Sequence, residues 1–377
     1  MLHSGGPERW LMDLCQGGPS ENLDMDVAVL WDMDGLFARK SRELKIPVFF
    51  CEGRTNPLKF ILNLRRIIRE QGPYDAIHSH LHAFSALVVL AARLEKIPAR
   101  VVHSHNVVTQ TSSLARRAYV GLARTLIRTF ATAGLAPAIG AMDSLMGPRW
   151  REDSRWSVMR CGISLEPFRA PIPQTVSRAS FGIPEDALVI GTVGRLCAEK
   201  NSEFMVDVLG EVLRRHANSY LLMLGEGPLK QTLEAKAEKG GFRNHLVLAG
   251  VRADVADVLR AAVDVFSLPS PPPPRGNEAL PIAVIEAQAC GLPTVISDGV
   301  TTESIIVPDL VVRIPEAAGP VAWAETLIEH AGRRQKNSAT AALAIMDETQ
   351  FNCTQNLKML ASLYRDPSAR KGGHLVE

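Results

Sequence analysis

Short apolar runs alternate with amphipathic segments along most of the chain. The apolar runs lie at residues 25–31, 47–50, 76–81, 100–105, 189–195, 219–225, 245–250, 263–268 and 293–298. Segments with helical spacing separate them, among them 83–95, 112–130, 201–216 and 229–238. Continuous apolar strands that alternate with helices are typical of parallel sheets covered on both faces. We therefore predict an α/β fold.

A proline-rich stretch interrupts this alternation. Four prolines fall within residues 166–184, which we interpret as a linker between two domains because the strand–helix pattern restarts after it. Two Rossmann-like domains would face each other across a cleft at the carboxyl ends of their strands, where such folds bind ligands. We expect the domains to span residues 1–165 and 166–345.

Composition and charge narrow the function. The 377 residues are 46% hydrophobic and carry a net charge of +2, which disfavours a nucleic-acid-binding protein that relies on broad phosphate neutralisation. The six cysteines are scattered without a CxxC pair, so we expect reduced thiols and a cytoplasmic location. We expect neither a membrane-spanning segment nor a signal peptide.

The stretch from residue 269 to 286 holds the first candidate chemistry. Glu278 lies in a polar loop beside Gly276, and Glu286 lies on an apolar segment with Pro281 near its first turn. A strand, a Gly/Pro loop and a helix N-terminus in succession present backbone N–H groups to phosphate. Because the carboxylates add acceptors for hydroxyl groups, the stretch suggests a nucleotide-sugar site.

Seven motifs carry a resemblance to a known family. They are GGPE (5–8), PYDAIHSHLHAFS (73–85), HSHN (103–106), CGISLEPF (161–168), GTVGRLCAEKN (191–201), GEGPL (225–229) and EALPIAVIEAQACGLP (278–293). With them the chain resembles the family-4 retaining glycosyltransferases of the GT-B fold, in particular those of bacterial capsule and exopolysaccharide synthesis. The resemblance implies transfer of a sugar from a UDP- or GDP-linked donor to a saccharide or polyprenyl-linked acceptor. It implies neither metal nor cofactor, and a C-terminal helix within 346–377 that crosses back to the first domain.

The resemblance assigns the donor diphosphate to cations and glycines. Arg195 and Lys200 would clamp the diphosphate and stabilise the leaving group as negative charge develops. Gly194 lies directly before Arg195. Gly5 and Gly6 would let the backbone of the first domain approach the phosphate, since neither has a Cβ.

The sugar and the ribose are assigned to a second set. Glu278, with the backbone N–H groups of Ala279 and Leu280, would hold the sugar, and Glu286 would accept hydrogen bonds from the ribose hydroxyls. A histidine at the end of the HSHN strand would contact the transferred sugar or assist at the acceptor oxygen. His105 is the first choice for that role and His103 the second, and a core or supporting histidine is the alternative reading.

The other histidines invite a metal-site interpretation. Strand alternation predicts one face for the side chains of His78, His80 and His82, and one for those of His103 and His105. We do not favour zinc, because no carboxylate or cysteine joins this spacing and the family needs no metal. We also interpret the Asp-Met-Asp at 32–34 as a turn, and GEGPL as the end of a strand.

The helix expected at 112–130 raises the question of membrane contact. Arg117, Arg124 and Arg128 fall on about one face, and Leu122, Leu126 and Phe130 could insert at a membrane surface. A basic, solvated helix face is the favoured reading, and peripheral contact with the inner face of the membrane is the alternative.

Two departures from the family pattern leave rival functions open. Family members begin with an apolar strand before the GG loop, and here the first strand of the N-terminal domain is expected to be missing, so that an added apolar strand would raise soluble yield and melting temperature. Ala279 replaces a glycine that would allow a positive φ, after a lengthened proline run. A GT-B nucleotide-sugar epimerase and a truncated, inactive sugar-nucleotide-binding protein are the alternatives.

Overall fold

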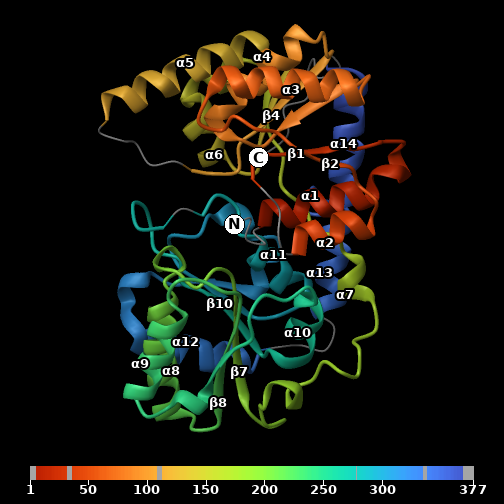
Figure 1. Ribbon diagram of the computed structural model, residues 1–377. Coiled ribbons are helices and arrows are strands. Elements are labelled where there is room, and N and C mark those ends of the chain that lie inside the picture. The colour runs from red at the N-terminus through yellow and green to blue at the C-terminus, as the bar shows by residue number, and fades with distance from the viewer. Residues whose placement is uncertain (1–5, 32–35, 108–112, 277, 334–337, 368–377) are drawn as a thin grey trace. The chain divides into compact units, whose positions relative to one another are not determined.

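The computed structural model describes residues 6–31, 36–107, 113–276, 278–333 and 338–367 (Figure 1). The chain divides into two compact units, each described by itself below. Unit 1 comprises residues 1–162 and 353–377, and unit 2 comprises residues 163–352. The boundaries expected at 165/166 and 345/346 lie near these divisions.

Unit 2 is built on a parallel six-stranded sheet. Its strands are β7 (Leu188–Val193), β8 (Ser219–Leu224), β9 (Leu246–Leu248), β10 (Val265–Leu268), β11 (Thr294–Ile296) and β12 (Val311–Arg313). They are arranged in the order β12-β11-β10-β7-β8-β9 with every pair parallel. Numbered from β7 and taken from β9 across, the order is 3-2-1-4-5-6, which is the Rossmann arrangement. The strand order reverses between β7 and β10, so this is where such a sheet binds ligands.

Helices cover both faces of this sheet. The helices on one face are α8 (Ser202–Arg215), α9 (Lys230–Lys239) and α12 (Gly319–Ala331), and those on the other are α10 (Val255–Ala262), α11 (Ile282–Ala289) and α13 (Ser338–Asp347) (Figure 1). Alternate residues of β10 separate into the two cores: Val265 packs with the α8 side, whereas Phe266 and Leu268 pack with the α10 side. The alternating strands and helices of this unit were therefore predicted correctly.

The proline-rich stretch is not a linker. It begins with α7 (Glu166–Arg169), and Phe168, Val176 and Ile183 are all buried in the same core as α10 and α11. The Arg178 guanidinium also donates to the Asp264 carboxylate at 2.6 Å. The linker interpretation was wrong because the apolar residues between the prolines supply enough buried surface to fix the segment on unit 2.

Unit 1 contains two parallel sheets. The larger has the order β3 (Ala76–Ser79), β4 (Ala99–His103), β5 (Ala133–Ala136) and β6 (Trp156–Val158), and the smaller pairs β1 (Val27–Val29) with β2 (Val48–Phe50). Gly134 in β5 leaves room for its neighbour, because a Cβ there would lie 1.7 Å from the ring of Trp156.

The helices of unit 1 come from both parts of the chain. They are α1 (Gly6–Gly17), α2 (Leu36–Glu43), α3 (Pro57–Gln71), α4 (Ser85–Leu94), α5 (Leu114–Phe130), α6 (Ile139–Met146) and α14 (Cys353–Arg365). Asn56 caps α3, with its side chain accepting from the Lys59 backbone N–H at 3.1 Å. In α14, the Asn356 side-chain oxygen accepts from the Trp10 indole at 2.9 Å and from the Gly162 N–H at 2.7 Å. The C-terminal helix thereby holds both ends of the first segment of unit 1.

Several expectations lie outside the described residues. The missing first strand concerns residues 1–5, and Gly5 and the Asp-Met-Asp turn at 32–34 also fall in undescribed stretches. All six cysteines are buried and free. In the described part of the chain, no helix is both long and apolar enough to cross a bilayer.

Candidate active site

Two loops of unit 2 meet at the point where its strand order reverses. One follows β7 and carries Gly194, Arg195 and Lys200, and the other follows β10 and leads to Glu278. The carboxyl ends of adjacent parallel strands lie at the same edge of a sheet, so residues separated by about 80 positions are brought to one place. Four of the predicted donor-binding residues are thus neighbours for a topological reason.

The loop after β7 is fixed by close backbone packing. Gly225 follows β8 with a φ of +143°, and a Cβ on it would lie 2.0 Å from the Gly194 carbonyl oxygen. A Cβ on Gly227 would lie 2.3 Å from the Leu196 carbonyl oxygen. The Leu196 N–H donates to the Glu226 carbonyl at 3.1 Å. GEGPL therefore ends a strand, as predicted, and its glycines also allow the two loops to touch.

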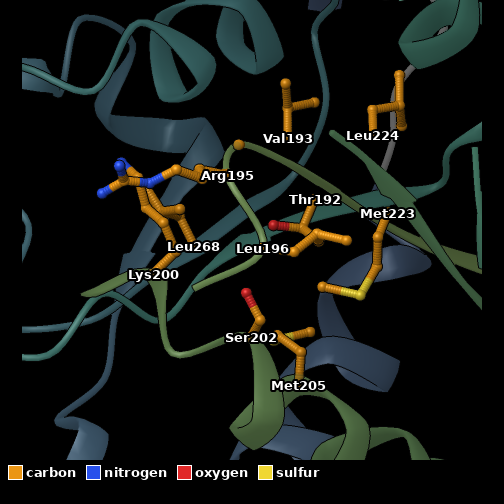
Figure 2. Close-up of a pocket in the computed structure, with 11 residues that line it drawn as sticks. Thr192, Val193, Arg195, Leu196, Lys200, Ser202, Met205, Met223, Leu224 and Leu268 are labelled. Atoms are coloured by element: carbon orange, nitrogen blue, oxygen red, sulfur yellow. The ribbon is translucent and has the colours of Figure 1, made fainter. Parts of the chain in front are cut away.

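A small pocket opens beside this loop (Figure 2). Its lining comes from β7, β8, β10, the first turn of α8 and the loop itself, and it comprises Thr192, Val193, Gly194, Arg195, Leu196, Lys200, Ser202, Met205, Met223, Leu224 and Leu268. Arg195 and Lys200 are the only cationic side chains in this lining. The pocket combines an apolar floor with two cations and a helix N-terminus, which favours an anionic group attached to a less polar one.

Both cations have carboxylate partners. The Lys200 ammonium donates to Glu278 Oε1, and the Ser270 hydroxyl donates to the same oxygen at 2.8 Å. The Glu278 side chain is 9% exposed and that of Lys200 is 29% exposed. Arg195 instead pairs with Glu199 at 2.5 Å in a more exposed position. The partly buried Lys200–Glu278 pair therefore links the two loops, whereas the exposed Arg195–Glu199 pair contributes little to stability.

The loop that leads to Glu278 is held at several points. The Asn201 side-chain amide donates to the Pro269 carbonyl at 3.3 Å and to the Glu316 carboxylate at 3.2 Å. Arg275 pairs with Glu316 at 2.5 Å. Sequence reasoning missed Ser270, Asn201 and Glu316 as supports. Only Asn201 lay in a recognised motif, and nothing in the chain's pattern marks Glu316.

Glu286 lies on α11 and is 3% exposed, so the helix prediction is confirmed and a solvated position is excluded. The Gln288 side chain anchors the helix, donating to the Ser304 carbonyl at 2.8 Å and accepting from the Ile306 and Val307 N–H groups at 2.8 and 2.9 Å. Ala279 is buried and its φ is not positive, so the alanine in place of a glycine causes no backbone strain there.

Leu280 is partly buried against the core of unit 2, and the other predicted residues belong to unit 1. Gly6 is the first residue of α1, and His105 follows β4. The His80 Nδ1 and His105 Nε2 atoms share a hydrogen bond of 2.9 Å, and the Cys161 sulfur lies 3.8 Å from His105 Nδ1. Burial lowers the pKa of His105 well below its usual value of 6.5, so the imidazole is neutral at pH 7.

Two expectations about unit 1 were wrong. His82 does not share a face with His78 and His80, because β3 ends at Ser79 and His82 adopts a φ of +50° in a short 3₁₀ turn. The arginines of α5 are also not a uniformly solvated face. Arg124 donates to the carbonyls of Ser144 and Leu145, and Arg128 donates to that of Met146, so both cap the end of α6.

Family models of known proteins match both parts of the chain. A model described as Glycosyltransferase Family 4 matches residues 4–166, and one described as Glycosyl transferases group 1 matches residues 173–328. The Bacillus subtilis protein named glycosyltransferase EpsF is 30% identical over 370 residues, which cover 96% of this chain and 94% of that protein. These matches lend no support to the epimerase alternative.

A second relative and one crystal structure extend the comparison. The Escherichia coli UDP-Gal:alpha-D-GlcNAc-diphosphoundecaprenol alpha-1,3-galactosyltransferase is 25% identical over 249 residues, covering 64% of this chain and 62% of that protein. Anabaena HepE in complex with UDP-glucose superposes with a TM-score of 0.76 at 19% identity, over 96% of each chain. The structural likeness establishes the two-domain GT-B fold.

Proposed function

This chain belongs to the group 1, family 4 glycosyltransferases, and from that membership we propose that it moves a hexose or related sugar, with retention, from a nucleotide diphosphate sugar to a saccharide or polyprenyl-linked acceptor of a surface polysaccharide. The observation that carries the proposal is the Lys200–Glu278 pair at the reversal of strand order in unit 2. A cation and a carboxylate held together there suit a ligand with both phosphate and hydroxyl groups.

The donor separates this pair when it binds. Its diphosphate takes Lys200 and Arg195 as counter-ions and lies against the first turn of α8, whose backbone dipole favours negative charge. Glu278, released from Lys200, then accepts hydrogen bonds from sugar hydroxyls while Ser270 keeps its carboxylate in place. As the bond from sugar to phosphate breaks, the two cations stabilise the charge that develops on the leaving diphosphate.

Glu286 is assigned to the ribose. Its burial at 3% exposure on an anchored helix favours a fixed acceptor rather than a solvated side chain. Uracil is the proposed base, because the galactosyltransferase relative is named for UDP-Gal and HepE was crystallised with UDP-glucose. The same relative is named for a diphosphoundecaprenol acceptor, which supports a lipid-linked acceptor here.

We also propose peripheral membrane contact through the first half of α5. Leu114, Tyr119 and Leu122 are 77%, 46% and 62% exposed, and Arg116 and Arg117 beside them are exposed as well. Apolar side chains flanked by cations suit the interface of an anionic bilayer, where a polyprenyl-linked acceptor resides.

A donor screen tests the proposal. Melting temperatures are measured with UDP- and GDP-linked sugars, and transfer to acceptors and donor hydrolysis are followed for the sugar that stabilises the chain. Glu286→Ala should abolish turnover and weaken donor binding, whereas Glu325→Ala, at an exposed carboxylate on α12, should do neither. Turnover unaffected by Glu286→Ala, or the absence of both binding and turnover in the wild type, contradicts the proposal, and a sugar isomer formed without acceptor indicates an epimerase.

A further inference from the structure

Three histidines of unit 1 converge at the end of the four-stranded sheet. We call His78, His80 and His103 the three-histidine group. One ring nitrogen from each lies within 4.8 Å of the others. His78 lies in β3, His80 directly follows that strand, and His103 ends the neighbouring strand β4. Parallel pairing of these strands places the three side chains at one edge of the sheet.

The ring spacing matches that of metal ligands. Ring centroids are 4.3 Å apart for His78 and His80, 5.5 Å for His80 and His103, and 5.4 Å for His78 and His103. A tetrahedral ion with Zn–N bonds of about 2.0–2.1 Å places the centres of its imidazole ligands about 5 Å apart. Small rotations of the rings would therefore bring the three nitrogens onto one ion.

The hydrogen bonds around the three-histidine group leave the Nε2 atoms of His78 and His80 available to an ion. His78 Nδ1 shares a hydrogen bond of 2.6 Å with the Tyr364 hydroxyl, and His80 Nδ1 shares one of 2.9 Å with His105 Nε2. A metal-bound histidine commonly uses one ring nitrogen for the ion and the other for such a partner, which fixes the ring. Neither bond uses the Nε2 atom of His78 or His80.

His103 supplies the strongest indication. The residue is fully buried, and neither of its ring nitrogens has a hydrogen-bond partner among the described residues. The buried Nε2 of His78 likewise has none there. Buried polar atoms are nearly always satisfied by protein, water or an ion, so these atoms point to a ligand.

We propose that His78, His80 and His103 bind one divalent ion of the zinc class, with Tyr364 and His105 orienting the ligand rings. Neutral imidazole nitrogen is a good ligand for zinc, whereas Mg²⁺ and Ca²⁺ prefer oxygen, and no carboxylate belongs to the group.

A second set of atoms competes for the same ion. His103, His105 and Cys161 also lie within 4.8 Å of one another. Both nitrogens of His105 already face partners, His80 on one side and the Cys161 sulfur on the other. The site therefore uses His80 rather than Cys161. Proximity of Cys161, 56 residues from His105, was not visible in the sequence spacing.

The test measures metal binding directly, so it stands whether or not the chain transfers sugar. The full chain, without a polyhistidine tag, is stripped with chelator and titrated with Zn²⁺ by calorimetry and with Co²⁺ by visible absorption. The wild type should bind one ion, and bound Co²⁺ should give the intense absorption of a tetrahedral site. Mg²⁺ should neither bind at the site nor compete with Zn²⁺.

Matched histidine variants localise the ion. His103→Gln should weaken Zn²⁺ binding at least 100-fold, whereas His82→Gln, from the same region but outside the group, should bind as the wild type does. His78→Gln is the second variant if His103→Gln fails to fold, as judged by circular dichroism. The proposal is overturned if His103→Gln or His78→Gln binds Zn²⁺ as tightly as the wild type does. It is also overturned if the wild type shows no stoichiometric Zn²⁺ binding. Loss of binding in Cys161→Ser, with a sulfur-to-Co²⁺ band in the wild type, also overturns it in favour of the competing set.

Discussion

Substitution of either partner in the Lys200–Glu278 pair should change nucleotide binding in opposite directions. Lys200→Met removes a cation from the diphosphate, whereas Glu278→Gln removes the carboxylate that competes with the diphosphate for Lys200. The Ser270 hydroxyl can still donate to the glutamine oxygen, so the loop remains supported. The two variants therefore separate the role of charge from that of loop structure.

The magnitudes follow from the exposure of the pair. A charge-assisted hydrogen bond contributes about 1.5–3 kcal/mol. Because the Lys200 side chain is 29% exposed, solvent screens it and the lower part of that range applies. Lys200→Met should then raise the Kd of UDP roughly 10- to 30-fold, at about 1.4 kcal/mol for each factor of ten. Glu278→Gln should lower that Kd by at most about fivefold, which corresponds to roughly 1 kcal/mol.

Calorimetry with UDP, or with GDP if the donor screen favours it, measures both effects without turnover. Transfer should be lost in both variants, since Glu278 is needed for the sugar. Lys230→Met provides the matched control, because Lys230 forms an exposed pair with Glu226 outside the pocket lining. Wild-type affinity in Lys200→Met, or equal weakening by both substitutions, would refute the reasoning.

Three further outcomes follow from other features. Gly225→Ala should lower the free energy of unfolding by at least about 2 kcal/mol in urea titrations, because φ is +143° there and the new Cβ would meet the Gly194 carbonyl. Leu122→Glu should abolish co-sedimentation with anionic vesicles at low salt. Hydrogen bonding to Arg155 lowers the pKa of Asp153 below its usual 3.8, so its stabilisation is present above that pH and lost as pH falls through the lowered pKa. The stability difference between wild type and Asp153→Asn, followed by urea unfolding, should therefore shrink below about pH 4.

Each of these has a control and a contrary result. Gly241→Ala shares the positive φ but has open space around it, so it should destabilise less than Gly225→Ala, and equal effects would count against the contact. Leu58→Glu alters a similarly exposed leucine on α3. If both substitutions reduce vesicle binding alike, the result would not support membrane contact through α5. A pH-independent difference for Asp153→Asn would show that its carboxylate is not the titrating group.

The sequence pattern predicted the strands and helices of unit 2 because short-range features of the sequence determine each of them. Its strands are buried on both faces and therefore appear as continuous apolar runs, and chain reversals are marked by glycine. The donor-site residues followed from the resemblance, whereas their meeting point followed from strand order. The proline-rich stretch was wrongly interpreted as a linker because prolines indicate turns. They do not reveal that Phe168 and Val176 are buried in the core of unit 2.

Unit 1 was less accessible to sequence reasoning because its contacts span long separations. Strand alternation assigned His82 to a strand that had already ended, and neither Cys161 nor Tyr364 lies near the histidines in sequence. Arg124 and Arg128 of α5 looked solvated because their acceptors are backbone carbonyls, which no sequence pattern displays. Such tertiary contacts override the local pattern.

The placement of α14 in unit 1 sets an order of events during synthesis. Domains generally form as units while the ribosome proceeds at about 5–20 residues per second, with the N-terminal domain first. Here Asn356, which accepts from both Trp10 and Gly162, is translated only after all of unit 2. Unit 2, which is one continuous segment, can therefore reach its native state while unit 1 still lacks α14. The nascent first segment must consequently stay soluble for the time needed to translate about 190 further residues.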